Sequence, residues 1–409
     1  MILRVLFLLI LPLGLVAKTI DVCPTCAATT IRQGIALAKT GDEVLVHPGT
    51  YREGNIIIDK SIILKGIDGP TVDGEDQYEI FTIKASGVTV EGFHLVNAGK
   101  STLKDMAAIR VDHQRHFSIC ENKVENAQFG IYLAYGFDGI VENNELKSNA
   151  RDEVSSGNGV HCWYAKRIFI AHNTIRQHRD GIYLEFTDDS HIVDNRSEGN
   201  LRYGLHFMFS NRDVYAYNTF IDNGAGVAVM FSKKIDMLYN RFEHNWGRSS
   251  YGLLLKEIYD ARLEHNQFLS NTIGILMEGA TRIDYRHNRF KRNGWAVQMT
   301  GGCIDNHFEA NAFQSNALDM VVNSNVNNNT FNGNYWSEYT GYDLDRDGYG
   351  DVPHRPVKLF SYITSQTPET IVLLRSFFVD LLNFSEKVSP ALTPANVADE
   401  RPLMQMPEI

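Results

Sequence analysis

The sequence has few cysteines, no excess of basic residues and no long apolar run. Its 5 cysteines in 409 residues are too few and too scattered for a disulfide scaffold. Asp and Glu number 49 against 39 Lys and Arg, which gives a formal net charge of −10. This balance argues against a nucleic-acid partner, which calls for clustered basic side chains. With 44% apolar and 22% charged residues, the chain has the composition of a folded protein.

The main apolar run lies at the amino terminus and is short for a membrane-spanning helix, which needs about 20 apolar residues. Residues 5–16 are almost all apolar and follow the single charge of Arg4. A basic residue, a short apolar run and a small residue such as Ala17 are typical of an export signal. The sequence therefore predicts a signal peptide over residues 1–17, cleaved near Ala17, and an exported, water-soluble mature protein. An uncleaved anchor is the alternative.

What the sequence contains instead is a repeat: an Asn, any residue, a usually apolar residue, two more residues and a second Asn. Successive copies lie 23, 22, 26, 22 and 23 residues apart and begin at Asn195, Asn218, Asn240, Asn266, Asn288 and Asn311. A fixed period of this length is the mark of a solenoid, in which each repeat buries its apolar face only against its neighbours. Further copies start as early as Asn122 and finish at Asn334. Longer intervals indicate loops at 150–156 and 246–250.

Each repeat also carries a Gly followed by alternating residues. The first and third residues after the Gly are apolar throughout, as in Gly204-Leu-His-Phe-Met and Gly226-Val-Ala-Val-Met. Because strand side chains alternate between faces, these residues point into the stack, and the second and fourth point out. The sequence predicts an all-β, right-handed parallel β-helix of about 22–23 residues per coil, with Asn side chains stacked inside the turns.

The two ends of the chain depart from the repeat. Residues 18–55 are expected to form an N-terminal segment and cap, in which helical spacing over 29–39 predicts a short helix ahead of the first strands. Such a helix would cover the open edge of the stack. The β-helix is expected over 56–335, followed by an acidic loop at 336–356 and a C-terminal helix and tail at 357–409.

Two methionines stand on the outward face of neighbouring coils. Met208 and Met230 both take the fourth position after their Gly, and adjacent strands lie about 4.8 Å apart. His206 lies on the same face as Met208, and His161 lies two coils away, roughly 10 Å. Thioether sulfur beside imidazole is the ligand set expected for Cu(I), so these four residues form a predicted copper site. The alternative is that the methionines pack under a loop or a partner. The same register puts three other methionines in the core: Met277, Met299 and Met320.

A polysaccharide-cleaving enzyme is the main alternative function for a β-helix. Glycoside hydrolysis requires two carboxyl groups about 5 to 9.5 Å apart. The outward carboxylates Glu185 and Glu278 are four coils apart, roughly 19 Å at the strand spacing, so they do not form such a pair. Lys256 stands alone in its column. We therefore expect a protein that is not an enzyme, with a β-helix lyase or epimerase as the alternative.

An acidic stretch follows the last repeat. Asp343, Asp345, Asp347 and Asp351 flank a Gly in a pattern that resembles the first half of a calcium loop. The Glu that closes such a loop at its twelfth position is missing. A calcium site and a polar turn that ends the solenoid are equal alternatives.

Two further pairs offer metal ligands. Cys23 and Cys26 suit a disulfide or a soft-metal site. His265 and His287 occupy equivalent positions in adjacent coils and could share a metal, although a stacked face of tyrosines and histidines is the favoured interpretation.

The chain resembles the NosD family, which consists of periplasmic copper-related proteins for the maturation of nitrous oxide reductase. The resemblance covers nearly all of the mature chain. It rests on the segments Gly204–Ser210, Gly224–Ser232, Phe242–Gly247, Tyr251–Lys256, Met277–Gly279, Gly333–Trp336, Gly341–Gly348 and Asp399–Met404. Cys23 and Cys26 lie outside this pattern.

The resemblance implies a β-helix that works with an ABC transporter and a copper-chaperone lipoprotein to supply copper to nitrous oxide reductase. Residues 370–388 are more apolar than a solvated helix requires. Within this frame they would dock on the membrane subunit of the transporter and hold the chain at the membrane. The face with Met208 and Met230 would handle transient Cu(I). A docking scaffold that binds no metal is the alternative.

Overall fold

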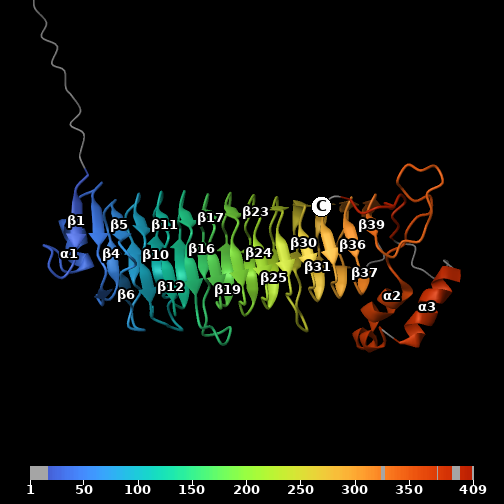
Figure 1. The fold of residues 1–409 in the computed structure, drawn as a ribbon, viewed down its shortest axis with the longest axis horizontal. Helices are drawn as coiled ribbons and strands as arrows, with labels where there is room; N and C mark the ends of the chain where they lie inside the picture. Colours follow the sequence, from blue (N-terminus) through green and yellow to red (C-terminus); the bar gives the residue numbers. More distant parts are fainter. Residues whose placement is uncertain (1–16, 324–327, 375, 389–396, 408–409) are drawn as a thin grey trace, which may run out of the picture.

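The computed structural model describes residues 17–407 except for 324–327, 375 and 389–396. All but the last residue of the expected export signal, 1–17, therefore lies outside the described residues. Figure 1 shows a long rod of stacked coils with a helical module at its carboxyl end. In the described part of the chain, no helix is both long and apolar enough to span a bilayer.

Three parallel sheets run along the rod. One has 14 strands, from β1 (Thr19–Val22) to β38 (Thr330–Asn332), and one has 13, from β3 (Thr50–Tyr51) to β39 (Tyr335–Trp336). The third, with 12 strands, carries the candidate site. It consists of β4 (Ile56–Ile58), β7 (Phe81–Ile83), β10 (Ala107–Asp112), β13 (Phe129–Ala134), β16 (Val160–Trp163), β19 (Asp180–Glu185), β22 (Tyr203–Met208), β25 (Ala225–Met230), β28 (Leu253–Lys256), β31 (Ile273–Glu278), β34 (Trp295–Met299) and β37 (Leu318–Val322). The predicted parallel β-helix is confirmed.

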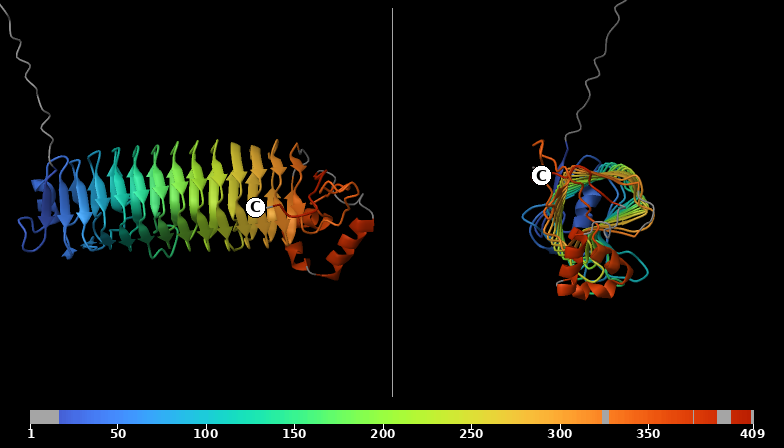
Figure 2. Two further views of the ribbon diagram at one scale, coloured as in Figure 1. Left: turned by 45° about the horizontal axis from the view of Figure 1, so that its top comes forward. Right: turned by 90° about the vertical axis from the view of Figure 1, so that its right-hand side faces the viewer.

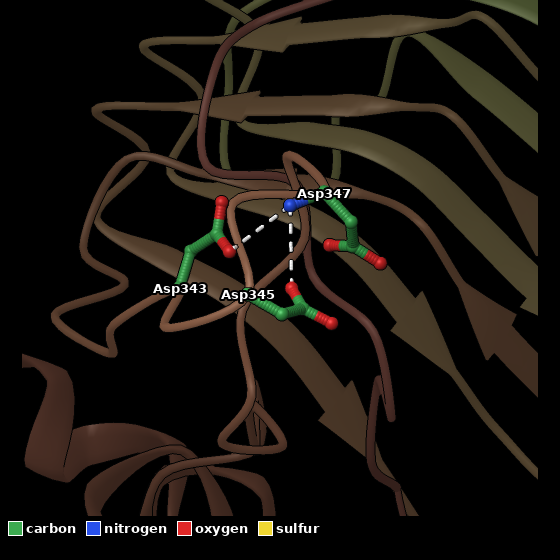
Figure 3. Close-up of side chains that lie close together, drawn as sticks. All are labelled: Asp343, Asp345 and Asp347. Carbon is green, nitrogen blue, oxygen red and sulfur yellow. Dashed lines mark hydrogen bonds between the residues drawn. The ribbon is translucent and has the colours of Figure 1, made fainter.

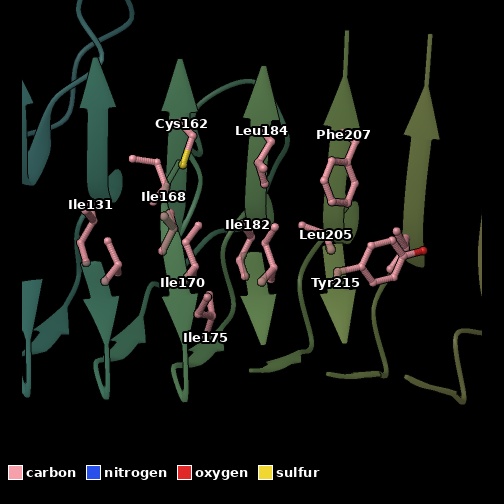
Figure 4. Packing of buried hydrophobic residues seen from close by; sticks show 14 of the residues in the cluster. Ile131, Cys162, Ile168, Ile170, Ile175, Ile182, Leu184, Leu205, Phe207 and Tyr215 are labelled. Atoms are coloured by element: carbon pink, nitrogen blue, oxygen red, sulfur yellow. The ribbon is translucent and has the colours of Figure 1, made fainter. Parts of the chain in front are cut away.

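The core is a continuous column of apolar side chains inside the coils. Figure 4 shows Leu184, Leu205 and Phe207 in this interior, where all three are buried. They are first or third residues after the Gly of their repeat, so the inward register is confirmed. The three methionines expected in the core are buried there as well: Met277, Met299 and Met320. The apolar residue of the Asn motif contributes stacked rings, such as Phe242 on Phe268 at 4.6 Å.

The first Asn of each repeat forms a directional ladder through the turns. The backbone N–H and Nδ2 of Asn218 both donate to Oδ1 of Asn240 at 3.0 Å. Nδ2 of Asn240 in turn donates to the carbonyl of Tyr215 at 2.9 Å and to Asn266. The ladder runs through Asn122, Asn144, Asn173, Asn195, Asn218, Asn240, Asn266, Asn288, Asn311 and Asn334. The predicted Asn stacking is thus confirmed, and it satisfies buried backbone groups that sheet pairing leaves free.

The amino-terminal end differs from the sequence interpretation. Helix α1 (Ile31–Leu37) does not precede the first strands but lies between β1 and β2 (Glu43–Val46). Since β1 pairs with β2 in the 14-stranded sheet, the β-helix begins at Thr19 rather than at residue 56. The helix still covers the open end, because Ile31 and Ile35 are buried in the main core. Strand β1 is only four residues long, which left too little alternation to reveal it.

The carboxyl-terminal module contains three helical segments instead of the single helix expected. These are α2 (Leu359–Gln366), the 3-10 helix η1 (Pro368–Leu373) and α3 (Phe377–Val388). Phe360 of α2 and Val379 of α3 pack with Leu318 of β37. Figure 2 shows the two α-helices beside the last coils of the rod.

The chain then returns to the rod and closes the Asn ladder with a carboxylate. Asp399 is fully buried and accepts hydrogen bonds from the backbone N–H and Nδ2 of Asn334 at 2.9 and 3.0 Å. It also accepts from Nε1 of Trp336 and from the N–H of Gly333. A ladder in which each Asn donates to the next needs an acceptor at its end, and a carboxylate offers only acceptors.

Candidate functional site

The strand register places the two outward methionines side by side. Met208 pairs with Met230 in the parallel ladder of β22 and β25, and both side chains are half-buried. Met230 packs against an apolar cluster on the outer face that includes Ala228 and Leu254. The outward placement of Met208 and Met230 agrees with the sequence prediction, and part of each side chain stays accessible.

Tyr183 connects Met208 to the two histidines. Its hydroxyl donates to the thioether sulfur of Met208 at 3.5 Å, and its ring stacks on His206 with centroids 4.5 Å apart. His206 thus lies on the same strand and face as Met208, with Tyr183 touching both.

His206 is a buried imidazole with unmatched nitrogens. It is 4% exposed, and neither ring nitrogen has a hydrogen-bond partner among the described residues. Its Nδ1 lies 3.7 Å from a carboxylate oxygen of Asp180, which is too long for a hydrogen bond. Burial lowers the pKa of His206, and the nearby Asp180 offsets only part of this shift. The ring is therefore neutral at pH 7, the state in which imidazole binds metals.

Arg202 and Asp180 form an ion pair beside His206 that the sequence did not predict. Arg202 binds the fully buried Asp180 through two hydrogen bonds, of 2.8 and 2.5 Å. Burial alone would raise the pKa of Asp180, but the hydrogen bonds and the charge of Arg202 outweigh it and lower the pKa to about 2. Asp180 precedes its Gly by one residue and Arg202 lies in the next turn, so only the three-dimensional stacking of coils brings them together.

The structure gives His161 a separate environment. The ring of Tyr183 lies between His161 and His206, with its centroid 4.9 Å from the first and 4.5 Å from the second. His161 lies 3.8 Å from the carboxylate of Glu185, and its Nδ1 is 3.3 Å from the side chain of Asn158. Burial lowers its pKa despite Glu185. Of the four predicted copper ligands, Met208 and Met230 lie in register and His206 lies on the strand of Met208. The ring of Tyr183 separates His161 from His206.

The outward carboxylates do not form a hydrolytic pair. Glu185 pairs in register with Met208, and Glu278 pairs with Lys256, whose ammonium lies 3.0 Å from it. Three strands separate β19 from β31 in the sheet. The four-coil separation expected from the sequence is therefore observed.

The acidic loop gathers three of its four predicted ligands. Carboxylate oxygens of Asp343, Asp345 and Asp347 lie within 4.8 Å of one another, and Figure 3 shows the first two around the backbone N–H of Asp347. Asp351 instead accepts from the backbone N–H of Leu344 at 2.6 Å. Arg401 supplies a positive charge, because its guanidinium lies 2.6 Å from Asp347.

The remaining predicted pairs have structural partners. Cys23 and Cys26 form a disulfide in the turn after β1. His265 and His287 stack face to face with centroids 5.0 Å apart, and Tyr239 stacks on His265 at 4.7 Å. A metal ligand bond lies in the plane of an imidazole, so two rings stacked through their faces do not aim at one ion. The stacked-face interpretation is confirmed.

Helix α3 presents an apolar surface to solvent. Its buried side carries Val379, while Phe377, Leu381 and Phe384 are 79%, 50% and 64% exposed. A cleft of about 1040 Å³ separates the helix from the acidic loop, with Phe384, Tyr339 and Tyr342 in its lining. Exposed apolar patches of this kind mark interaction surfaces.

Known proteins match the chain over most of its length. A family model described as "Periplasmic copper-binding protein (NosD)" matches residues 143–341. A protein of Pseudomonas aeruginosa named "Probable ABC transporter binding protein NosD" is 31% identical over 396 residues, which cover 91% of each chain. A protein of the same name from Stutzerimonas stutzeri is 28% identical over 91% of this chain and 89% of its own.

Solved structures share the fold at low sequence identity. The A-module of the mannuronan C-5 epimerase AlgE6 of Azotobacter vinelandii is 14% identical, with a TM-score of 0.53 over 72% of this chain and 84% of its own. The Dettilon tailspike protein is 13% identical, with a TM-score of 0.56 over 75% of this chain and 68% of its own. These likenesses concern the β-helix alone, whereas the sequence match to the Pseudomonas protein spans both chains nearly completely. The chain belongs to the NosD family of periplasmic copper-binding proteins.

Proposed function

We propose that this protein is a periplasmic accessory factor that receives and passes on Cu(I) for the maturation of nitrous oxide reductase. It would work with an ABC transporter and a copper-chaperone lipoprotein, and it would not act as an enzyme. The relatives are named ABC transporter binding proteins, which supports the transporter as a partner.

The observation that carries the proposal is the pair Met208 and Met230, half-buried and in register on one face. Thioether sulfurs are soft ligands that select Cu(I) over harder ions. His206 would complete the set, since its neutral ring has two nitrogens without hydrogen-bond partners among the described residues. Copper is cargo in this scheme, so a site with few, partly accessible ligands suits transfer better than permanent storage.

A Cu(I) titration with a competing chelator tests the site. The variant Met208→Leu with Met230→Leu preserves volume and should cost less than about 1.5 kcal/mol in stability, while Cu(I) affinity falls at least tenfold. Met404→Leu, on the returning tail, is the matched control and should bind as the parent does. Unchanged affinity in the double variant would refute the copper site and favour a docking scaffold without metal.

The apolar side of α3 is the proposed contact with the membrane subunit of the transporter, within the predicted segment 370–388. Deleting residues 370–409 would also remove Asp399 and unseat the last Asn of the ladder, so point variants are the sharper test. Phe377→Glu with Phe384→Glu should abolish co-purification with the transporter and leave the unfolding temperature unchanged. Tyr217→Glu, an exposed aromatic on another face, is the control. Retained association would contradict the proposed contact.

Two further hypotheses, calcium binding and activity on carbohydrates, can be tested directly. Calcium at Asp343, Asp345 and Asp347 stays a prediction, and it requires Arg401 to move from Asp347; a rise in unfolding temperature with added Ca²⁺ would support it. A carbohydrate-active protein would bind or cleave polysaccharide. The separation of Glu185 from Glu278 in the strand register speaks against hydrolysis by those two residues.

A further inference from the structure

A stripe of stacked aromatic rings runs along the outer edge of the 12-stranded sheet. The rings of Tyr135, Tyr164, Phe186, Phe209 and Phe231 stack in sequence, with centroids 5.3, 4.6, 5.2 and 5.1 Å apart and planes within 17° of parallel. We refer to these five residues as the ring ladder. Its last four rings are 37–41% exposed. At the spacing of adjacent strands, the ladder is roughly 19 Å long.

The fold does not require aromatic residues at these positions. Each of the five has a positive φ, between 48° and 53°, a conformation that is unfavourable for bulky side chains. In the next coils the equivalent positions hold Glu257 and Gly279, since Lys256 pairs in register with Met230 and with Glu278. The solenoid therefore accepts a charged residue or no side chain at this place. Five stacked rings in a row, four of them exposed, at a strained position indicate a surface selected for contact.

The ring ladder is continuous with the two methionines. Phe209 and Phe231 directly follow Met208 and Met230 in the chain. The thioethers and the ring edges thus form one partly exposed apolar surface across adjacent coils. Ion pairs lie beyond it: Lys166 with Asp189 at 3.0 Å, Arg167 with Asp138, and Arg212 with Asp188 and Asp189. Lys233 and Lys234 follow Arg212 in the next coil.

The stacking geometry selects among partners. The ring faces are covered by their neighbours, so a sugar or a planar ligand cannot stack on them, and only the ring edges meet solvent. Aromatic edges carry partial positive charge. Thioether sulfur is complementary to such edges, and sulfur–aromatic contacts at the ring edge contribute about 0.3–1.5 kcal/mol each.

We propose that the ring ladder is the docking surface for the methionine-bearing face of the protein that exchanges Cu(I) with this chain. This inference rests on the proposed copper function. Direct exchange of Cu(I) between two sets of thioethers requires the two sets to meet with water excluded. Rings beside Met208 and Met230 would seal that contact and would hold the incoming sulfur atoms next to the pair.

The test measures binding and copper transfer separately. The probe is the Cu(I)-loaded soluble domain of the copper-chaperone lipoprotein, added to the full mature chain. The variant Phe209→Glu with Phe231→Glu should weaken binding about tenfold or more, the effect of losing a central aromatic contact, and slow transfer to match. Its own Cu(I) affinity should stay unchanged, because the methionines are intact. Met208→Leu with Met230→Leu should lose Cu(I) affinity and keep its binding to the chaperone.

A second exposed ring stack supplies the matched control. Tyr217 and Tyr239 stack at 4.9 Å, have positive φ and are 57% and 47% exposed, but they lie away from the methionines. Tyr217→Glu with Tyr239→Glu should leave binding and transfer as in the parent. If the Phe→Glu pair lowers the unfolding temperature, Phe209→Ser with Phe231→Ser replaces it.

Several results would overturn the proposal. These are unchanged binding in the Phe209/Phe231 variant, equal loss in the tyrosine control, or no binding of the chaperone by the parent chain. Binding of the parent to phosphatidylglycerol vesicles that is lost in the Phe209/Phe231 variant would instead assign the surface to a membrane. Loss of Cu(I) affinity in the methionine variant with normal chaperone binding in the phenylalanine variant would leave the copper site standing and remove the docking surface.

Discussion

The protein contains two kinds of buried polar column, and they differ in how completely their hydrogen bonds are made. Inside the turns, Asn240 accepts from Asn218 and donates to Asn266 and to a backbone carbonyl. On the outer face of the 12-stranded sheet, His206 is equally buried but has no hydrogen-bond partner for either nitrogen among the described residues.

This difference in hydrogen bonding distinguishes residues that stabilise the fold from residues that are candidates for ligand binding. A buried polar group without a partner costs about 1–3 kcal/mol, so a fold whose only requirement is stability removes it. The Asn ladder has no such cost and repeats coil after coil. The outer column changes from coil to coil, with Tyr183, His206 and Ala228 at one register position. A feature that varies along a regular scaffold and stays unsatisfied is where a ligand is expected.

The largest effect is expected at the end of the ladder. Asp399→Ala leaves four donors of Gly333, Asn334 and Trp336 without their carboxylate acceptor, which should cost about 3 kcal/mol or more. Urea unfolding followed by the fluorescence of buried Trp336 measures this loss. The exposed Asp345→Ala should change stability by less than about 0.5 kcal/mol, and equal effects of the two variants would contradict the role of Asp399.

A smaller loss is expected within the ladder. Asn240→Ala removes the acceptor for two donors of Asn218 and the donor to Tyr215, at a cost of about 2 kcal/mol. Hydrogen exchange should speed up at the amides of Asn218 and its neighbouring coils. Asn149→Ala, which removes a surface contact with Lys100, is the control. Similar exchange rates in both variants would show that the ladder hydrogen bonds do not stabilise the coils.

Removing the polar group of His206 on the outer face should, in contrast, cost little stability. His206→Phe keeps the stacking on Tyr183 and removes the unmatched nitrogens, so stability at pH 7 should change by less than about 1 kcal/mol. Because burial lowers the pKa of His206, the parent loses stability as the pH falls below about 6.5, where the unfolded chain takes up the proton. The variant should lose less stability between pH 7 and pH 5. Cu(I) affinity should fall as well, and an unchanged affinity would remove His206 from the ligand set.

The smallest effect concerns the second Asn of each repeat, which forms a ladder of its own that also ends on a carboxylate. It runs through Asn200, Asn223, Asn245, Asn271, Asn293 and Asn316. Nδ2 of Asn316 donates to Asp319 at 3.1 Å, and burial raises the pKa of Asp319 to about 6. The protonated form is therefore favoured in the folded state, and its contribution is lost as the pH rises from about 4 through 6. Asp319→Asn should flatten this slope by an amount of order 1 kcal/mol, since the side chain is partly exposed. An unaltered pH profile of the unfolding temperature would contradict the shift.

The repeat made most of the fold predictable. The Gly and the alternation after it set the register, so the outward place of Met208 and Met230 and the inward place of Met277 followed from the sequence. Asp399 could not be found in this way, because it reaches Asn334 across a separation of 65 residues and lies outside the repeat. The burial of His206 was also missed, since it depends on the rings of Tyr183 and Tyr203 that pack beside it.

The number of coils sets the distance between the two proposed contact surfaces, the methionine face and the apolar side of α3. Four strand steps separate β25, which carries Met230, from β37, against which the helical module packs. At the strand spacing this is roughly 19 Å. Whole coils can be gained or lost without altering either end, because each Asn needs only the next as its acceptor. The distance from the methionines to the apolar side of α3 can therefore change only in steps of about 4.8 Å, so a partner that engages both surfaces must match a particular number of coils.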